Sequence, residues 1–155
     1  MFFKKKAAQP QAQKKELLYK GNIKTGCKEM PKEKIIRELG QMLVETGYVT
    51  TAYIDGMLER EKTYSTYMGL GLAIPHGVEA AKAQVIESGI AVMTFPNGTM
   101  WDDEKANLVV GIASVGDGHL EILSNISEKV MEEELMAKLI NGDVDAVYNI
   151  LSVKE

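Results

Sequence analysis

The sequence has few of the residues that build disulfides, metal centres or membrane spans. Its single cysteine, Cys27, excludes an internal disulfide and suits a reducing compartment. Cys27 has no partner at CxxC spacing, so we expect neither thiol catalysis nor metal binding there. No apolar run approaches the roughly 20 residues of a transmembrane helix, and the apolar start Met1-Phe2-Phe3 is too short for a secretory signal. We therefore expect a cytoplasmic protein without stable membrane insertion.

Positive charge is also in short supply. The 18 lysines and arginines are outnumbered by 22 aspartates and glutamates, which gives a net charge of −4. Because no broad basic surface is implied, nucleic acid is not expected as a partner.

The composition of the remainder is that of an ordinary globular domain. Hydrophobic residues make up 45% and charged residues 26% of 155 residues, enough for one domain with a real core. Residues 1–15 contain five lysines and three glutamines, which predicts a flexible basic tail before a single domain at 16–155.

Helical periodicity recurs along the domain. Apolar residues at helical spacing predict a helix over 32–45 that ends at Thr46-Gly47, and a second from Thr50 or Thr51 to about Lys62. Three further helices are expected in the last third of the chain, starting at His119 and covering 135–140 and 144–151, the last capped by Asp143.

Short apolar or β-branched segments predict strands between these helices. They lie at 16–24, 70–74, 88–95 and 107–115, and Pro96-Asn97-Gly98 is a turn signal that predicts a hairpin into Thr99-Met100-Trp101. Since strands alternate with helices, the expected fold class is α/β: a single domain with a central mixed β-sheet flanked by helices.

One imidazole stands at the end of a predicted strand. His76 follows Pro75, which restricts the backbone before it, and precedes Gly77, which we expect to leave room beside the ring for a phosphoryl group. A neutral imidazole nitrogen is a good nucleophile near pH 7. His76 is thus either a nucleophile that accepts a phosphoryl group or a histidine that only caps a turn.

Two more residues could join His76. His119 follows the strand at 107–115, so both rings would share one sheet edge if the two strands are neighbours. Arg60, near the end of the second helix, could bind phosphate oxygens. Alternatively, Arg60 pairs with Glu59 or Glu61 on the surface, and His119 simply begins a helix.

Other chemistries lack their usual patterns. Asp117 beside His119 could complete a Ser/His/Asp triad with Ser65 or Ser124, but no GxSxG motif occurs. The two histidines and Asp117 could bind zinc, but their spacing matches no HExxH or CxxC site. We expect no metal and no cofactor.

The motifs around these residues resemble a known family. Ile74-Pro75-His76-Gly77 is similar to the phosphoacceptor motif of the mannitol/fructose-type EIIA domain of the bacterial phosphoenolpyruvate-dependent sugar phosphotransferase system. The resemblance extends over about residues 16 to 151. Arg60-Glu61-Lys62, the following Ser65-Thr66-Tyr67 and the run from His119 to Ser124 are most like the mannitol branch.

The resemblance implies a fold and a function. The fold would be an α/β sandwich with a mixed sheet. The protein would be a phosphotransferase component that accepts a phosphoryl group from phospho-HPr on Nε2 of His76, with Arg60 and His119 around the phosphoryl oxygens. It would pass the group to the EIIB domain of a membrane sugar permease, for mannitol uptake. The alternative is a nitrogen-related regulatory EIIA protein that acts by phosphorylation-dependent protein binding.

Overall fold

The computed structural model describes residues 15–116 and 118–152, without the side chain of His119. The predicted tail, apart from Lys15, lies outside the described residues, as does Asp117. None of the described helices is both long and apolar enough to cross a membrane.

The described strands form one mixed sheet in the order β1-β4-β5-β3-β2. The long strands β4 (Gly89–Trp101) and β5 (Glu104–Ala113) pair antiparallel at its centre. The short strands β1 (Ile23–Lys24) and β3 (Leu72–Ala73) pair parallel with β4 and β5 respectively, and β2 (Tyr67–Gly69) runs antiparallel to β3. Because β3 and β5 are parallel neighbours, the segments that follow them lie at the same edge of the sheet, which was the condition set for His76 and His119.

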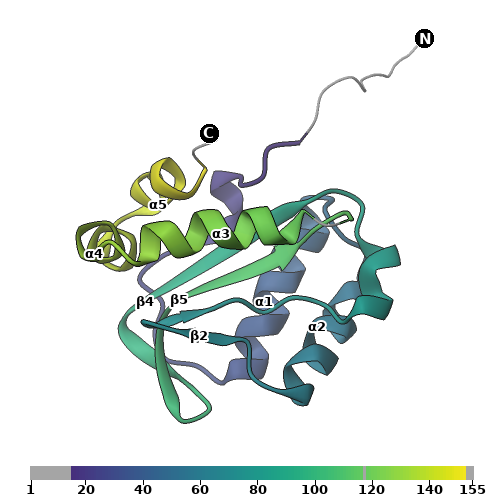
Figure 1. Cartoon of the computed structure of the whole chain (residues 1–155), viewed down its shortest axis with the longest axis horizontal. Helices are drawn as coiled ribbons and strands as arrows, with labels where there is room; N and C mark the ends of the chain where they lie inside the picture. The colour runs from purple at the N-terminus through teal and green to yellow at the C-terminus, as the bar shows by residue number, and fades with distance from the viewer. Residues whose placement is uncertain (1–14, 117, 153–155) are drawn as a thin grey trace.

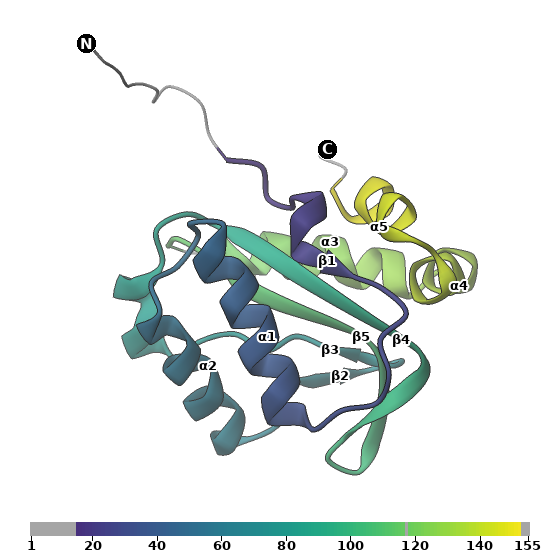
Figure 2. The same cartoon turned by 180° about the vertical axis from the view of Figure 1, so that it is seen from behind.

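Helices cover both faces of this sheet (Figures 1 and 2). One face packs against α1 (Lys32–Glu45) and α2 (Ala52–Thr63), and the other against α3 (His119–Val130), α4 (Glu133–Asn141) and α5 (Val144–Leu151). Two short 3-10 helices, η2 (Lys20–Asn22) and η3 (Glu79–Gln84), lie in the connections. The predicted α/β fold with a mixed sheet between helices is confirmed.

Alternation along the central strands explains the two cores. Met93 and Val109 face α1 and α2, whereas Val92 and Val110 face α3 to α5, and all four side chains are fully buried. A strand buried on both faces reads as a continuous apolar run, which is how the segment at 107–115 reads in the sequence.

The helix boundaries follow the local signals. The first helix has the predicted range 32–45, and Gly47 after it has the positive φ of +87° that a glycine adopts at a helix C-terminus. The Asp143 carboxylate accepts a hydrogen bond from Ala146 N at 3.0 Å and so caps α5 as predicted.

The predicted hairpin at Pro96-Asn97-Gly98 is wrong. Strand β4 continues to Trp101, and the turn lies at Asp102 and Asp103, since Trp101 pairs with Glu104. The segment 96–98 falls instead within an irregularity where the register shifts between Thr94 and Thr99. Thr99 Oγ1 accepts from Met30 N at 3.1 Å and donates to Met30 O at 3.0 Å, so a distant segment holds the strand beyond the irregularity.

Two predicted strands are shorter than expected. Within 70–74, Leu70 and Gly71 form a turn with Gly69, at φ values of +55°, +79° and +99°, and only Leu72–Ala73 is strand. Three successive positive φ values are incompatible with an extended chain. Within 16–24, the 3-10 helix η2 leaves only Ile23–Lys24 as strand.

Candidate functional site

His76 lies just beyond β3, against the end of β5. Its backbone bridges to Ile112, whose N–H donates to Pro75 O at 3.0 Å. The ring is half-buried, and its Nδ1 lies 2.9 Å from Ile74 O. A carbonyl oxygen only accepts, so Nδ1 carries the hydrogen of this bond. In the neutral ring the nucleophilic lone pair then belongs to Nε2.

The hydroxyl of Tyr53, in α2, binds the backbone of two segments at the site: Gly77, which follows His76, and Ile112 of β5. It donates to Ile112 O at 2.8 Å and accepts from Gly77 N at 2.8 Å. Burial raises the pKa of the Tyr53 phenol, against a smaller opposing effect of the Gly77 N–H. The phenol therefore remains a neutral donor throughout the physiological range.

The position of Tyr53 corrects the expectation for Gly77. A Cβ on residue 77 would lie 2.6 Å from Tyr53 Cε1, so the space beside Gly77 is filled by the Tyr53 ring. The Gly77 N–H points to the Tyr53 hydroxyl. The glycine is required for close packing of α2 on the His76 segment, and its N–H is engaged within the protein.

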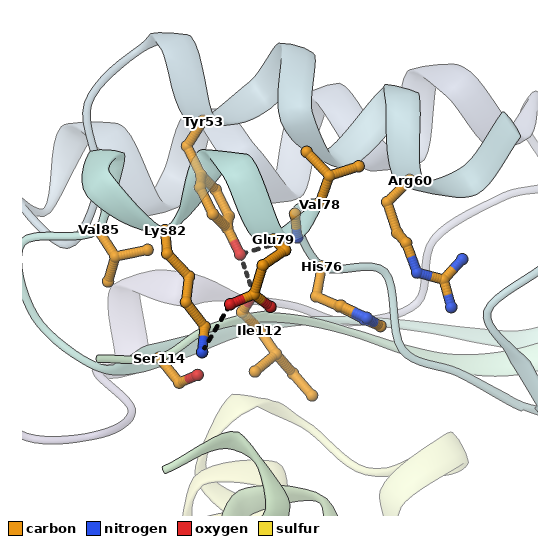
Figure 3. Close-up of a pocket in the computed structure, with 10 residues that line it drawn as sticks. Tyr53, Arg60, His76, Val78, Glu79, Lys82, Val85, Ile112 and Ser114 are labelled. Carbon is orange, nitrogen blue, oxygen red and sulfur yellow. Dashed lines mark hydrogen bonds and ion pairs between the residues drawn. The ribbon is translucent and has the colours of Figure 1, made fainter. Parts of the chain in front are cut away.

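A cavity of about 270 Å³ opens beside His76. Figure 3 shows Arg60 on one side of His76, and Tyr53, Glu79 and Lys82 on the other. The residues that line the cavity come from α2, the segment 76–85 and the end of β5: Tyr53, Arg60, His76, Gly77, Val78, Glu79, Lys82, Val85, Ile112 and Ser114.

Arg60 reaches this cavity from the last turns of α2. Its Nη1 donates to Tyr64 O at 2.9 Å, and the guanidinium carbon lies 4.4 Å from the centroid of the exposed Tyr64 ring. In the described part of the chain, the Arg60 guanidinium forms no ion pair with the carboxylate of Glu59 or Glu61. The surface pair considered for Arg60 is therefore not formed, and a stacked guanidinium lines the same cavity as His76.

His119 is the first residue of α3, after the segment that continues from β5. Its side chain lies outside the described residues, as does Asp117, so the triad and zinc interpretations built on them lie outside the description too. Because β3 and β5 run parallel, the backbones at His76 and His119 both follow the same end of the sheet. Elsewhere in the described chain, no group of three or more His, Cys, Asp or Glu side chains could hold a metal ion.

Lys82 is a cavity cation that sequence reasoning missed. Its Nζ donates to Gly116 O at 2.9 Å and lies 3.6 Å from Glu79 Oε2. It thus connects η3, which follows His76, to the segment that leads into His119. The sequence around Lys82 shows only a short helix or turn, and the contact that gives the lysine its place joins residues far apart in the chain.

Comparison with known proteins gives consistent matches. The family model "Phosphoenolpyruvate-dependent sugar phosphotransferase system, EIIA 2" matches residues 16–154. The mannitol-specific phosphotransferase enzyme IIA component of Halalkalibacterium halodurans is 46% identical over 119 residues, which cover 77% of this chain and 82% of the relative. The corresponding component of Bacillus subtilis is 43% identical over 139 residues, which cover 86% and 97%.

One solved structure is similar over most of the chain. It is enzyme IIA for mannitol from Escherichia coli, in a complex with phosphorylated enzyme IIB for mannitol. The two chains share 34% identity and a TM-score of 0.79, over 84% of this chain and 94% of the other.

Proposed function

This chain belongs to the EIIA 2 family of the phosphoenolpyruvate-dependent sugar phosphotransferase system, and from that premise we propose that it carries a phosphoryl group on His76. The donor is phospho-HPr, and the acceptor is the EIIB domain of a mannitol permease. The names of the relatives support mannitol, and the solved complex of a similar protein with phosphorylated enzyme IIB supports EIIB as the partner.

The observation that carries the proposal is the orientation of the His76 ring. The hydrogen bond of Nδ1 to Ile74 O places the nucleophilic lone pair on Nε2. Nε2 attacks the phosphorus of the HPr phosphohistidine, the P–N bond to HPr breaks, and the HPr imidazole leaves with the electron pair. In the second transfer a cysteine thiolate of EIIB attacks the phosphorus, the P–N bond to His76 breaks, and the His76 imidazole leaves with the electron pair.

We propose that Arg60 and His119 bind the phosphoryl oxygens. Arg60 presents a guanidinium, which stays protonated and matches the geometry of phosphate oxygens. His119 is proposed as the second donor at the N-terminus of α3, where the helix dipole favours an anion. The Gly77 N–H has no part in this, because it donates to Tyr53.

The test is the intact mass after incubation with phosphoenolpyruvate, enzyme I and HPr. We expect a gain of one acid-labile phosphoryl group that is absent from His76→Ala. A wild-type chain that gains nothing, while HPr itself is phosphorylated, would overturn the proposal. Subsequent addition of a mannitol EIIB domain should remove the group. Retention at that step would favour the nitrogen-related regulatory function.

The role of Arg60 is tested against a matched cation on the same helix. Arg60→Ala should slow transfer from phospho-HPr by about a hundredfold, the usual cost of losing one transition-state donor. Lys62→Ala, which removes an exposed cation two residues further on, should leave the rate near that of the wild type. Equal rates for the two variants would exclude Arg60 as a phosphoryl ligand.

A further inference from the structure

Glu61 is a buried carboxylate that the proposed transfer leaves without a role. The residue is 6% exposed, although its neighbour Arg60 lines the cavity. Oε1 accepts from the Thr66 hydroxyl at 2.6 Å, and Oε2 accepts from Thr66 N and Trp101 Nε1, each at 3.0 Å. Lys32 Nζ lies 3.4 Å from Oε2 and supplies the opposite charge. A buried carboxylate with this many donors is a strong and directional anchor.

A short series of bonds runs from Glu61 to the imidazole. Thr66, which the carboxylate holds by both its backbone N–H and its hydroxyl, accepts from Ile74 N through its own carbonyl at 3.1 Å. The carbonyl of Ile74 is in turn the partner of His76 Nδ1. The carbonyl that orients the ring therefore belongs to Ile74, the residue whose N–H is bound by Thr66 and so held in place by Glu61.

The bonds between Glu61 and Thr66 also fix the ends of the segment that contains Tyr64, the residue that orients Arg60. Arg60 donates to Tyr64 O and stacks on the Tyr64 ring. Tyr64 lies between Glu61 and Thr66 in the chain, so the bonds between those two residues close a tight loop around it. Displacement of Thr66 would move the guanidinium and the imidazole together.

We propose that Glu61 is a positioning residue for phosphoryl transfer, which sets both the Nδ1–H tautomer of His76 and the place of the Arg60 guanidinium. This inference rests on the proposed function, because it takes His76 as the acceptor. It assigns Glu61 no contact with the phosphoryl group.

Three variants separate this role from simple stability. Glu61→Ala removes the acceptor and leaves the Thr66 and Trp101 donors unpaired. Glu61→Gln keeps the shape: its oxygen can accept from Thr66 N and Trp101 Nε1, and its amide can donate to a Thr66 hydroxyl that turns to accept. Glu59→Ala is the matched control, an exposed glutamate of the same helix.

The experiment combines a rate with a spectroscopic signature. The transfer rate from phospho-HPr is measured per folded molecule, and the tautomer of the His76 ring is read from two-bond ¹H–¹⁵N correlations at matched pH. For Glu61→Ala we expect a loss of about tenfold or more, as for misplaced reacting groups, and a changed tautomer signature. Glu61→Gln and Glu59→Ala should keep the wild-type signature and rates within about threefold, which is less than 1 kcal/mol.

Unchanged rate and ring signature in folded Glu61→Ala would overturn the proposal. If that variant does not fold, Thr66→Val decides: it removes only the hydroxyl on Oε1, and it should slow transfer and alter the signature, whereas no change in either would overturn the proposal. A wild-type chain that accepts no phosphoryl group would refute the proposed function alone, since the ring signature still tests the link from Glu61 to His76.

Discussion

Tyr53→Phe is the perturbation whose size follows most directly from the structure. It removes one hydroxyl and leaves the ring, so packing against Gly77 is kept while two hydrogen bonds are lost. Ile112 is only 2% exposed, so its carbonyl oxygen would stay buried, whereas Gly77 is partly exposed and its N–H can be hydrated. An unsatisfied buried polar group costs about 1 to 3 kcal/mol. With one group fully and one partly unsatisfied, we expect a loss of about 2 kcal/mol.

Thermal unfolding followed by circular dichroism measures this loss. In a domain of this size each kcal/mol lowers Tm by about 2 to 4 °C, so Tyr53→Phe should unfold roughly 4 to 8 °C below the wild type. Tyr64→Phe is the control, because the Tyr64 side chain is exposed, and its Tm should not move. A Tyr53→Phe variant within about 1 °C of the wild type would refute the view that this hydroxyl holds α2 to the His76 segment.

Three further changes test the surroundings of the site. Gly77→Ala places a Cβ 2.6 Å from Tyr53 Cε1, so denaturant unfolding should show a loss of about 1 to 3 kcal/mol, and an unchanged midpoint would contradict the close packing. Tyr64→Ala removes the ring under Arg60 and should slow transfer from phospho-HPr about two- to fivefold, whereas Tyr64→Phe should not. Burial raises the pKa of both Tyr48 and Tyr53, so the unfolded chain loses these protons first. Urea midpoints should therefore fall as the pH rises above about 10, with a shallower fall in Tyr53→Phe.

The helices were predictable because their signals are local. The apolar stripe of 32–45, with Gly47 after it, specifies both faces and the end of α1 without reference to the rest of the chain. The same holds for Asp143 at the start of α5. The mixed sheet followed from the alternation of strand and helix signals.

The turns were harder, because distant contacts override local propensity. Pro96-Asn97-Gly98 has the composition of a hairpin turn, yet Met30 binds Thr99 and keeps the strand going to Trp101. Leu70 has no tendency toward positive φ, and it adopts one because glycines flank it at a tight turn. Neither outcome can be read from a window of a few residues.

The residues around His76 divide in the same way. His76 and Arg60 stand out in the sequence because an imidazole after proline and a guanidinium at a helix end have recognisable chemistry. Tyr53, Lys82 and Glu61 do not stand out, since each acquires its place through a partner on another element: Ile112 O, Gly116 O and Trp101 Nε1. The sequence thus indicated which residues carry the chemistry, whereas the residues that hold them in place could be identified only from the folded structure.

The strand order also bears on how the chain folds. The β4–β5 and β2–β3 pairs are hairpins between consecutive strands, whereas the parallel β1–β4 and β3–β5 pairs join segments that are distant in the chain. Contacts with large loop-closure entropy form late. The only tryptophan, Trp101, lies in the β4–β5 hairpin, but His76 meets Ile112 only through the parallel alignment of β3 with β5. During refolding, tryptophan fluorescence should therefore recover before the ability to accept a phosphoryl group.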